Sequence, residues 1–331
     1  MKSFSYARAN DQAMAIDLIS ENSNSKFLGG GTNLIDLMRE YIEQPDSLVD
    51  ITRLPLANVE ELPDGGLRIG AMVRNSHLAA NRLVRERYPV LAEAILNGAS
   101  AQLRNMATTG GNLMQRTRCY YFYDSASHCN KRVPGSGCDA INGFNRIHAI
   151  LGTSPDCIAT HPSDMCVAMA ALDAVVRVTG KEGERTIPMV DFHRLPGDTP
   201  NIDTNLRIGE LITAVDLPAL PFARRSMYRK VRDRASYAFA LVSVAAAVEV
   251  EDGVVKQARL ALGGVAHKPW RAFAAERYLV GKTADEGTFH QAAALELEGA
   301  RAFQHNGFKI ELAERTIVNV WMELSMGGAR Q

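Results

Sequence analysis

The chain has 331 residues, of which 46% are hydrophobic, and its 37 basic side chains balance its 37 acidic ones. This length predicts two or three globular domains rather than one. A chain without net charge is a poor partner for nucleic acid or for an anionic membrane surface, and no apolar run approaches the ~20 residues of a membrane span. We therefore expect a packed globular protein whose partners are neither nucleic acid nor a membrane.

Four of the five cysteines, Cys119, Cys129, Cys138 and Cys157, lie within 39 consecutive residues. The first six residues lack the apolar segment of a secretory signal, so the sequence by itself predicts a cytoplasmic location. In a chain without such a signal, clustered cysteines favour metal ligation over disulfide bonds.

The N-terminal region predicts a strand at 4–6, an amphipathic helix at 11–19, a strand at 26–28 and a helix at 34–41. Between the last two lies the run Gly-Gly-Gly-Thr-Asn at 29–33. A glycine turn between a strand and a helix places backbone N–H groups where an anion binds, and glycine lets the backbone approach a phosphate at positive φ. The run does not match the dinucleotide fingerprint G-x-G-x-x-G, and a tight turn would explain it as well.

Further elements follow the same patterns of hydrophobicity. We expect strands at 47–51 and 66–71, a helix that begins with an Asn or Ser cap near residue 75, and a helix at 89–96. A buried helix is expected at 165–174, with Cys166 as a small core residue. Three strands then complete an antiparallel sheet, at 174–178, 184–187 and 210–217.

A polar, glycine-rich loop is expected at 102–112. Thr108, Thr109 and Asn112 offer hydroxyl and amide groups beside two glycines, which suits a second contact with a diphosphate. A capped loop between two helices would have the same composition, so both interpretations stay open.

Residues 116–160 have the character of an insertion, because no period of 2 or 3.6 persists in them. A structureless loop of this length is normally functional or disordered, and its four cysteines offer a way to order it. They are separated by nine, eight and eighteen residues, unlike the compact C-x₂-C runs of ferredoxins and zinc ribbons. Spacing alone therefore leaves an iron–sulfur cluster, zinc or unpaired thiols open.

The best linker is at 218–221, and a second domain with mixed strands and helices follows it. Its expected strands are at 226–230, 238–250 and 256–263, and its expected helices are at 271–279, 286–297 and 308–323. The fold class is thus α+β. The domain at 1–220 consists of a small α/β part at 1–55 and a larger α+β part at 56–220 that carries the insertion, and the C-terminal domain is at 225–331.

The two glycine-containing segments, 26–34 and 102–113, together resemble the paired flavin-diphosphate loops in the FAD-binding subunits of molybdenum hydroxylases, the xanthine dehydrogenase family. Residues 69–71 and 228–237 also fit the family pattern, and the match covers essentially the whole chain. The resemblance implies a two-part FAD-binding domain of the vanillyl-alcohol-oxidase and molybdenum-hydroxylase type. A C-terminal domain of the carbon monoxide dehydrogenase flavoprotein type would follow it.

The resemblance also implies which residues contact FAD. The backbone of the two loops would hold the diphosphate, and Asp164 would bond the ribityl chain or the ring edge. Ile212 would pack near the ring, and Lys230 would lie near its pyrimidine end, where a cation stabilises anionic reduced flavin. The full set of expected contacts is Lys26, Phe27, Leu28, Gly29, Gly30, Gly31, Thr32, Asn33, Leu34, Thr108, Thr109, Gly111, Asn112, Asp164, Ile212 and Lys230. Each of the last three residues also has an interpretation without flavin. Asp164 would be an acid at a helix N-terminus, Ile212 an ordinary residue of the sheet core, and Lys230 part of a solvated basic turn.

The cysteine-bearing insertion is most similar to that of bacterial periplasmic aldehyde oxidoreductases, whose FAD-binding subunits add a [4Fe–4S] cluster. The flavin subunit of 4-hydroxybenzoyl-CoA reductase is a more distant relative of the same kind. On this resemblance the four clustered cysteines ligate one [4Fe–4S] cluster. Cys166, His128 and His161 are not expected to be ligands of that cluster.

The resemblance therefore implies an oxidoreductase subunit that relays electrons and has no catalytic residue of its own. Its expected cofactors are FAD and [4Fe–4S]. Its expected partners are a 2Fe–2S subunit, a molybdopterin subunit and an external electron acceptor, with export to the periplasm on a partner's twin-arginine signal. Three alternatives stay open: a flavin subunit of a xanthine dehydrogenase or hydroxybenzoyl-CoA reductase complex, a stand-alone flavin oxidoreductase, and a scaffold subunit with a zinc-stapled loop.

Overall fold

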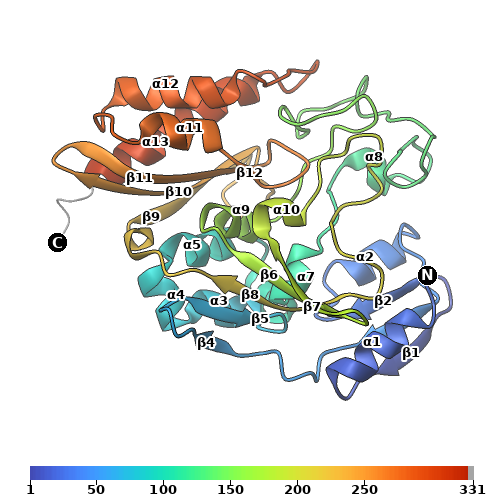
Figure 1. Ribbon diagram of the computed structural model, residues 1–331. Coiled ribbons are helices and arrows are strands. Elements are labelled where there is room, and N and C mark those ends of the chain that lie inside the picture. The colour runs from blue at the N-terminus through green and yellow to red at the C-terminus, as the bar shows by residue number, and fades with distance from the viewer. Residues whose placement is uncertain (327–331) are drawn as a thin grey trace.

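The computed structural model describes residues 1–326 and builds them around three β-sheets (Figure 1). The first sheet is parallel with strand order β1-β3-β2, the second is antiparallel with order β4-β5-β8-β6-β7, and the third is antiparallel with order β12-β11-β10-β9. The strands are β1 (Ser5–Arg8), β2 (Ser25–Leu28), β3 (Ser47–Asp50), β4 (Val59–Glu61), β5 (Leu67–Gly70), β6 (Val175–Gly180), β7 (Gly183–Pro188), β8 (Leu211–Leu217), β9 (Ser226–Val231), β10 (Val242–Glu251), β11 (Val254–Gly263) and β12 (Trp270–Arg271).

Helices connect and cover these sheets, which confirms the expected α+β class. They are α1 (Gln12–Ser20), α2 (Leu34–Arg39), α3 (Asn75–Ala80), α4 (Arg82–Arg87), α5 (Pro89–Asn97), α6 (Ala101–Met106), α7 (Thr109–Leu113), α8 (Tyr120–Tyr123), α9 (Asp164–Ala171), α10 (Met189–Phe192), η1 (Pro221–Arg224), α11 (Phe273–Leu279), α12 (Glu286–Leu297) and α13 (Phe308–Met326). Within residues 1–326, none of these helices is both long and apolar enough to span a bilayer.

The N-terminal sheet presents the first glycine loop at the end of β2. Asp11 caps α1 by accepting a hydrogen bond from the N–H of Met14 at 2.8 Å, and Ala15, Ile16 and Ile19 of that helix are buried. Because the strands are parallel, all three end at the same sheet edge, where ligands commonly bind in open α/β sheets.

The segment 102–112 differs from the expected loop, because it contains α6 and α7. Ser100 accepts from the N–H of Leu103 at 3.3 Å, and Thr108 accepts from the N–H of Gly111 at 3.2 Å. Each hydroxyl satisfies an N–H group that a helix start leaves unpaired, which allows helices too short to show a period in the sequence.

Smaller differences concern element ends and short elements. The first helical residue of α3 is Asn75 and its N-cap is Arg74, so the expected Asn or Ser cap is wrong. The helix expected at 271–279 begins later, at Phe273, because Trp270–Arg271 pairs with β11 as a strand. Besides α6 and α7, six short elements were not predicted: Val59–Glu61, Arg82–Arg87, Tyr120–Tyr123, Met189–Phe192, Pro221–Arg224 and Trp270–Arg271.

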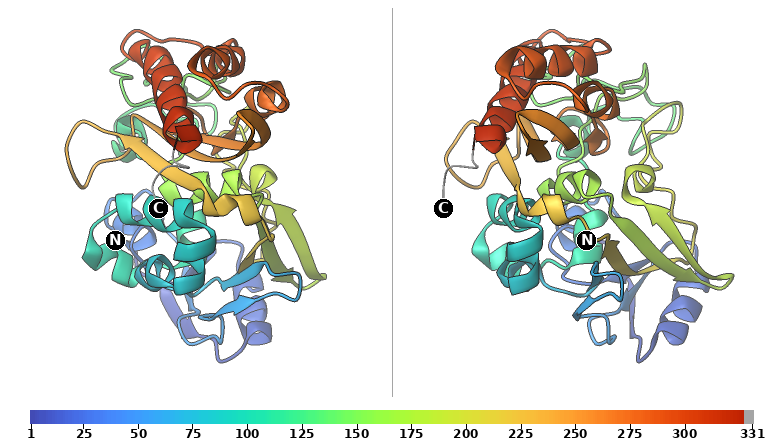
Figure 2. Two further views of the ribbon diagram at one scale, coloured as in Figure 1. Left: turned by 90° about the vertical axis from the view of Figure 1, so that its left-hand side faces the viewer. Right: turned by 60° about the vertical axis from the view of Figure 1, so that its left-hand side comes forward.

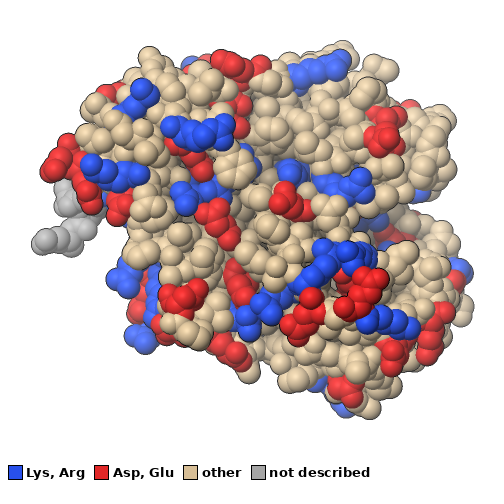
Figure 3. Space-filling model, in the orientation of Figure 1, with Lys and Arg blue, Asp and Glu red and all other residues tan. Residues whose placement is uncertain are grey.

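The C-terminal sheet lies between two layers of helices. Figures 1 and 2 show α11, α12 and α13 on one face of this sheet and α5 and α9 toward the other. Trp321 and Phe289 are fully buried in the helical layer, with ring centroids 5.6 Å apart. Figure 3 shows basic and acidic side chains mixed over the visible face of the molecule.

The insertion at 116–160 is held against this C-terminal layer by backbone contacts. The N–H of Ile150 donates to Val265 O at 2.9 Å, and the N–H of Arg301 donates to Ile150 O at 2.7 Å. The insertion is therefore ordered partly by contacts with connecting segments of the C-terminal domain, more than a hundred residues further along the chain.

Candidate functional site: a two-loop trough beside four cysteines

Two cavities of about 730 and 550 Å³ meet where the two glycine segments approach each other. Both are lined by Thr32, Asn33, Gly111 and Gln115. Because they share this wall, they form one elongated trough with the glycine segments at its middle. An extended ligand with two bulky ends fits such a shape.

At the middle of the trough, three positions need glycine for different steric reasons. A Cβ at Gly30 would overlap the carbonyl oxygen of Met106, so this glycine is needed where the two segments touch. Gly31 has φ +72°, a conformation that L side chains rarely adopt. A Cβ at Gly111 would lie 2.9 Å from Thr108 Oγ1. The positive φ expected of the first loop thus applies to Gly31, and close packing explains Gly30.

Asn33 leaves an unused donor in the shared wall. Its Oδ1 accepts from the N–H of Arg116 at 3.0 Å, whereas its buried Nδ2 has no hydrogen-bond partner among residues 1–326. A buried polar atom without a partner is costly, so this donor fits an anionic group in the trough. Together with the glycines that keep the backbone bare, it makes the residues present suitable for a dinucleotide diphosphate.

The structure distributes the expected FAD contacts over the trough. The smaller cavity is lined by all of 26–34 together with Thr108, Gly111 and Ile212, and the larger one by Asn112, Asp164 and Lys230. Thr109 is directed elsewhere: its hydroxyl donates to Val73 O at 3.1 Å and holds α7 against the end of β5.

A buried ion pair forms one wall of the larger cavity. Lys230 Nζ lies 2.8 Å from Asp164 Oδ2 and donates to Asn97 O at 3.1 Å, and the Lys230 side chain is 1% exposed. The hydroxyl of Tyr228 donates to the other oxygen of Asp164, and burial followed by this carboxylate raises the pKa of Tyr228 well above its usual value. The pair joins the start of α9 to β9, so Asp164 is also a helix N-terminal acid, as the alternative interpretation held.

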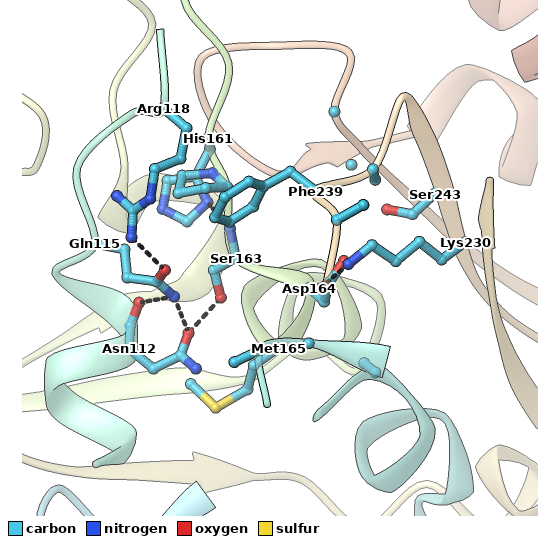
Figure 4. A pocket seen from close by; sticks show the side chains of 18 of the residues that line it. Asn112, Gln115, Arg118, His161, Ser163, Asp164, Met165, Lys230, Phe239 and Ser243 are labelled. Carbon is cyan, nitrogen blue, oxygen red and sulfur yellow. Dashed lines mark hydrogen bonds and ion pairs between the residues drawn. The ribbon is translucent and has the colours of Figure 1, made fainter. Parts of the chain in front are cut away.

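A polar network that the sequence did not reveal crosses the floor of this cavity (Figure 4). Gln115 Nε2 donates to Asn112 Oδ1 at 2.9 Å, and the Ser163 hydroxyl donates to the same oxygen. Arg118 donates to Gln115 Oε1 at 3.3 Å and stacks over the ring of Phe239 at 5.2 Å. The signal for Gln115 and Arg118 was their place in the polar run directly after the second glycine segment.

The four clustered cysteines line one small cavity of their own. Cys129 and Cys138 face each other as an antiparallel bridge, Cys119 immediately precedes α8, and Cys157 lies near the end of the insertion. Cys119, Cys129 and Cys157 are buried and Cys138 is half-buried. The structure thus brings together thiols that are up to 38 positions apart in the chain.

The surroundings of these thiols suit a bound cationic group. Burial raises the pKa of Cys119 and of Cys157 to about 12, so their thiolates need a nearby positive charge. The N–H of Ala159 donates to Cys157 Sγ at 3.5 Å, a bond of the kind that tunes iron–sulfur clusters. This donor set fits a metal or an iron–sulfur cluster.

A buried cation ties the cysteine cavity to the rest of the domain. The side chain of Lys131 is 1% exposed, forms an ion pair with Asp203 and donates to Pro200 O at 2.8 Å. Burial by itself would raise the pKa of Asp203, but Lys131 and Arg116 outweigh it and lower this pKa to about 2. Asp203 therefore stays ionised and anchors both basic residues.

A trough between two glycine segments, with a buried ion pair at one end and a cysteine cavity alongside, defines a protein that binds an extended nucleotide cofactor. The family follows from the sequence. The chain belongs to the FAD-binding subunits of molybdenum hydroxylases: residues 2–220 match the FAD binding domain in molybdopterin dehydrogenase, and residues 226–324 match the CO dehydrogenase flavoprotein C-terminal domain. It is an oxidoreductase subunit, and the expected family is confirmed.

Similar proteins span the whole chain. The aldehyde oxidoreductase FAD-binding subunit PaoB of Escherichia coli is 54% identical over 98% of both chains. The glyceraldehyde dehydrogenase medium chain of Sulfolobus acidocaldarius is 30% identical over 84% of this chain and 82% of its own. Among solved structures, quinoline 2-oxidoreductase from Pseudomonas putida 86 has a TM-score of 0.76 at 24% identity over 100% of both chains, which shows the same fold.

Proposed function

We propose that the chain is the FAD- and [4Fe–4S]-containing electron-transfer subunit of a molybdenum-dependent aldehyde oxidoreductase. The observation that carries this proposal is the contact between the two sites: Arg118 lines the trough and the next residue, Cys119, lines the four-cysteine cavity. Two redox groups that share a wall in this way are placed for electron transfer. The aldehyde specificity rests on the E. coli relative, which is named for that activity.

In this proposal the two glycine segments hold the diphosphate of FAD at the middle of the trough. Bare backbone at Gly29–Gly31 and the Nδ2 donor of Asn33 face the anion. Residues 26–28 line the smaller cavity for the nucleoside end, and the larger cavity receives the ring. When bound, FAD supplies the ability to accept two electrons and to release them singly.

The Lys230–Asp164 pair sets the electrostatics at the ring end of the trough. As a neutral pair it adds little net charge, but Lys230 Nζ offers a positive centre when negative charge develops in the adjoining cavity. Tyr228 and Asn97 O hold the two members in place. Stabilisation of anionic reduced flavin, the role expected of Lys230, is therefore proposed for the two residues together.

Cys119, Cys129, Cys138 and Cys157 are proposed as the ligands of one [4Fe–4S] cluster. The support is their common cavity, the N–H···S bond at Cys157 and the buried Lys131 beside it. The four thiolates supply the complete ligand set that such a cluster takes. His128, which lines the same cavity, is largely exposed and lies 3.3 Å from Asp139, which agrees with its interpretation as a non-ligand.

The proposed partners are a 2Fe–2S subunit and a molybdopterin subunit, with aldehyde oxidation on the latter. Electrons would enter this chain from the 2Fe–2S subunit and leave to an external acceptor. The medium-chain names of the Sulfolobus and carbon monoxide dehydrogenase relatives support membership of a multi-subunit enzyme.

The test compares the chain alone with the chain in its complex. The isolated chain should contain FAD and four irons and should show no aldehyde oxidation with an artificial electron acceptor, while the complex turns over. Robust turnover by the isolated chain would favour a stand-alone flavin oxidoreductase. Zinc in place of iron in protein prepared without air would overturn the cluster.

A further inference from the structure

A third group of metal-binding side chains lies outside both the trough and the four-cysteine cavity. One ring nitrogen each of His161 and His193, and the Sγ of Cys166, lie within 4.8 Å of one another. They come from three segments: His161 directly follows the insertion, Cys166 belongs to α9, and His193 directly follows α10. The two imidazole rings have centroids 4.1 Å apart.

Both histidines carry a buried nitrogen that nothing satisfies. Within the part of the chain that the structure describes, Nε2 of His161 and Nδ1 of His193 have no hydrogen-bond partner. His193 is 2% exposed, so this nitrogen is also shielded from water. Two such atoms on neighbouring rings are rare in a packed interior, because a buried polar atom left unpaired is costly.

The hydrogen bond of His193 Nε2 determines whether the unpartnered Nδ1 can act as a metal ligand. Nε2 of His193 lies 2.8 Å from the carbonyl oxygen of Leu113, which can only accept, so the ring proton is on Nε2. Nδ1 therefore holds a lone pair. A ligating histidine characteristically donates its other N–H to a carbonyl in this way.

A neighbouring histidine repeats this arrangement. Nδ1 of His267 lies 2.8 Å from Arg194 O, and its buried Nε2 has no hydrogen-bond partner among residues 1–326. Burial lowers the pKa of His193 and His267 to about 4, and burial followed by these two rings lowers the pKa of His161 well below its usual value. Neutral imidazoles are the form that binds a metal.

We propose that His161, Cys166 and His193 bind one Zn²⁺ ion, separate from FAD and from the four clustered cysteines. Two imidazoles and one thiolate form a donor set typical of zinc, and a water would complete the four positions. On binding, the ion displaces the thiol proton of Cys166 to solvent. His161 and its neighbour Ser163 line the larger cavity, so the ion can enter from the trough (Figure 4).

Ligation through Nε2 of His161 has a structural consequence. In the described structure the N–H of Ser163 donates to Nδ1 of His161 at 3.3 Å. A zinc ion on Nε2 puts the ring proton on Nδ1, so this long bond opens. The ion replaces it with a stronger link that joins the end of the insertion to α9 and to the segment after α10.

The experiment uses the complete complex, purified from zinc-supplemented cells without chelators. We measure zinc, iron and FAD per chain and record zinc K-edge X-ray absorption. The expected spectrum has nitrogen or oxygen at about 2.0–2.1 Å and one sulfur at about 2.3 Å. Four sulfurs in this shell would place the zinc on the clustered cysteines and overturn the proposal.

Three variants locate the ion. Cys166→Ala and His193→Ala should each lose one zinc per chain while iron and FAD stay at the native level. The matched control is His128→Ala, which removes an exposed histidine and should keep the zinc. Native zinc no higher than in a Cys166→Ala, His193→Ala double variant overturns the proposal. Because the native spectrum alone identifies the ligands, the test holds even if a variant does not fold.

Discussion

Gly30 shows how one missing side chain determines the shape of the trough. The carbonyl oxygen of Met106 occupies the place where its Cβ would be. The contact joins the end of β2 to the end of α6, which are more than seventy residues apart in the chain. Any side chain at this position therefore forces the two halves of the proposed diphosphate site apart.

We expect Gly30→Ala to weaken FAD binding at least about tenfold, which corresponds to about 1.4 kcal/mol. The measurement is FAD content and the dissociation constant for FAD re-added to deflavinated complex. Gly299→Ala is the matched control, because among the described residues no heavy atom lies within 4 Å of its Cβ position. Full FAD occupancy in folded Gly30→Ala would contradict the assignment of this segment.

Removing either member of the Lys230–Asp164 pair should shift the midpoint potential of the flavin, in opposite directions for the two residues. Lys230→Met leaves the carboxylate unbalanced beside the flavin and should lower its midpoint potential, whereas Asp164→Asn leaves the cation unbalanced and should raise it. We expect shifts on the order of 30 mV or more for the two-electron couple, equivalent to about 1.4 kcal/mol. Potentiometric titration of the flavin measures both. Shifts of the same sign would mean general disruption rather than electrostatics.

At the scale of elements, the first turn of α13 contains a buried lysine that the sequence did not predict. Lys309 is fully buried, and its Nζ donates to the carbonyl oxygens of His148, at 2.8 Å, and of Gly264. The helix start is thereby connected to the insertion and to the end of β11. Burial lowers the pKa of Lys309 to about 7.

This lowered pKa makes stability depend on pH. Between about pH 7 and 10.5 the unfolded chain binds the lysine proton and the folded chain does not, so the free energy of unfolding rises with pH. We expect Lys309 to contribute about 2 kcal/mol of increase between pH 7 and 9. Chemical unfolding of the native protein and of Lys309→Met measures it, since the variant should lose this rise. Parallel curves for the two proteins would contradict the prediction.

At the scale of the whole molecule, the insertion is held at two places of different kinds. Its middle, around the Cys129–Cys138 bridge, surrounds the cysteine cavity, and its later part at 147–151 is bonded to the C-terminal domain. The proposed ligation would therefore not be the sole source of its order, because backbone hydrogen bonds to the C-terminal domain also hold the insertion. The two parts should respond differently when iron is removed.

We expect Cys138→Ser to lose the cluster and to increase hydrogen exchange at 128–139 while 147–151 stays protected, because metal binding is coupled to folding where the ligands are. Hydrogen–deuterium exchange with iron analysis measures both effects. Cys166→Ala is the control for iron and should retain all of it, because Cys166 does not line the four-cysteine cavity. Four irons retained in Cys138→Ser would remove it from the ligand set.

The sequence by itself determined the features that local chemistry encodes. Periodic apolar residues predicted most helices and strands, and the two glycine segments indicated a diphosphate contact, with a tight turn and a capped loop as the alternatives. Flavin was implied only by the family resemblance. The resemblance then placed the chain in its family, because loop composition and order are read along the chain. The short helices at 101–113 were not predicted, because hydroxyl caps and packing stabilise them rather than a periodic pattern of apolar residues.

Only the tertiary structure decided which distant residues meet. The contact of Gly30 with Met106, the pairing of Lys230 with Asp164 and the approach of His161 to His193 join segments between 32 and 76 positions apart. The meetings depend on how three sheets pack, and packing is set by many weak contacts together rather than by any one residue's preference. For that reason the sequence could name members such as Lys230 and Asp164 one by one, whereas their partners in space were decided by the fold.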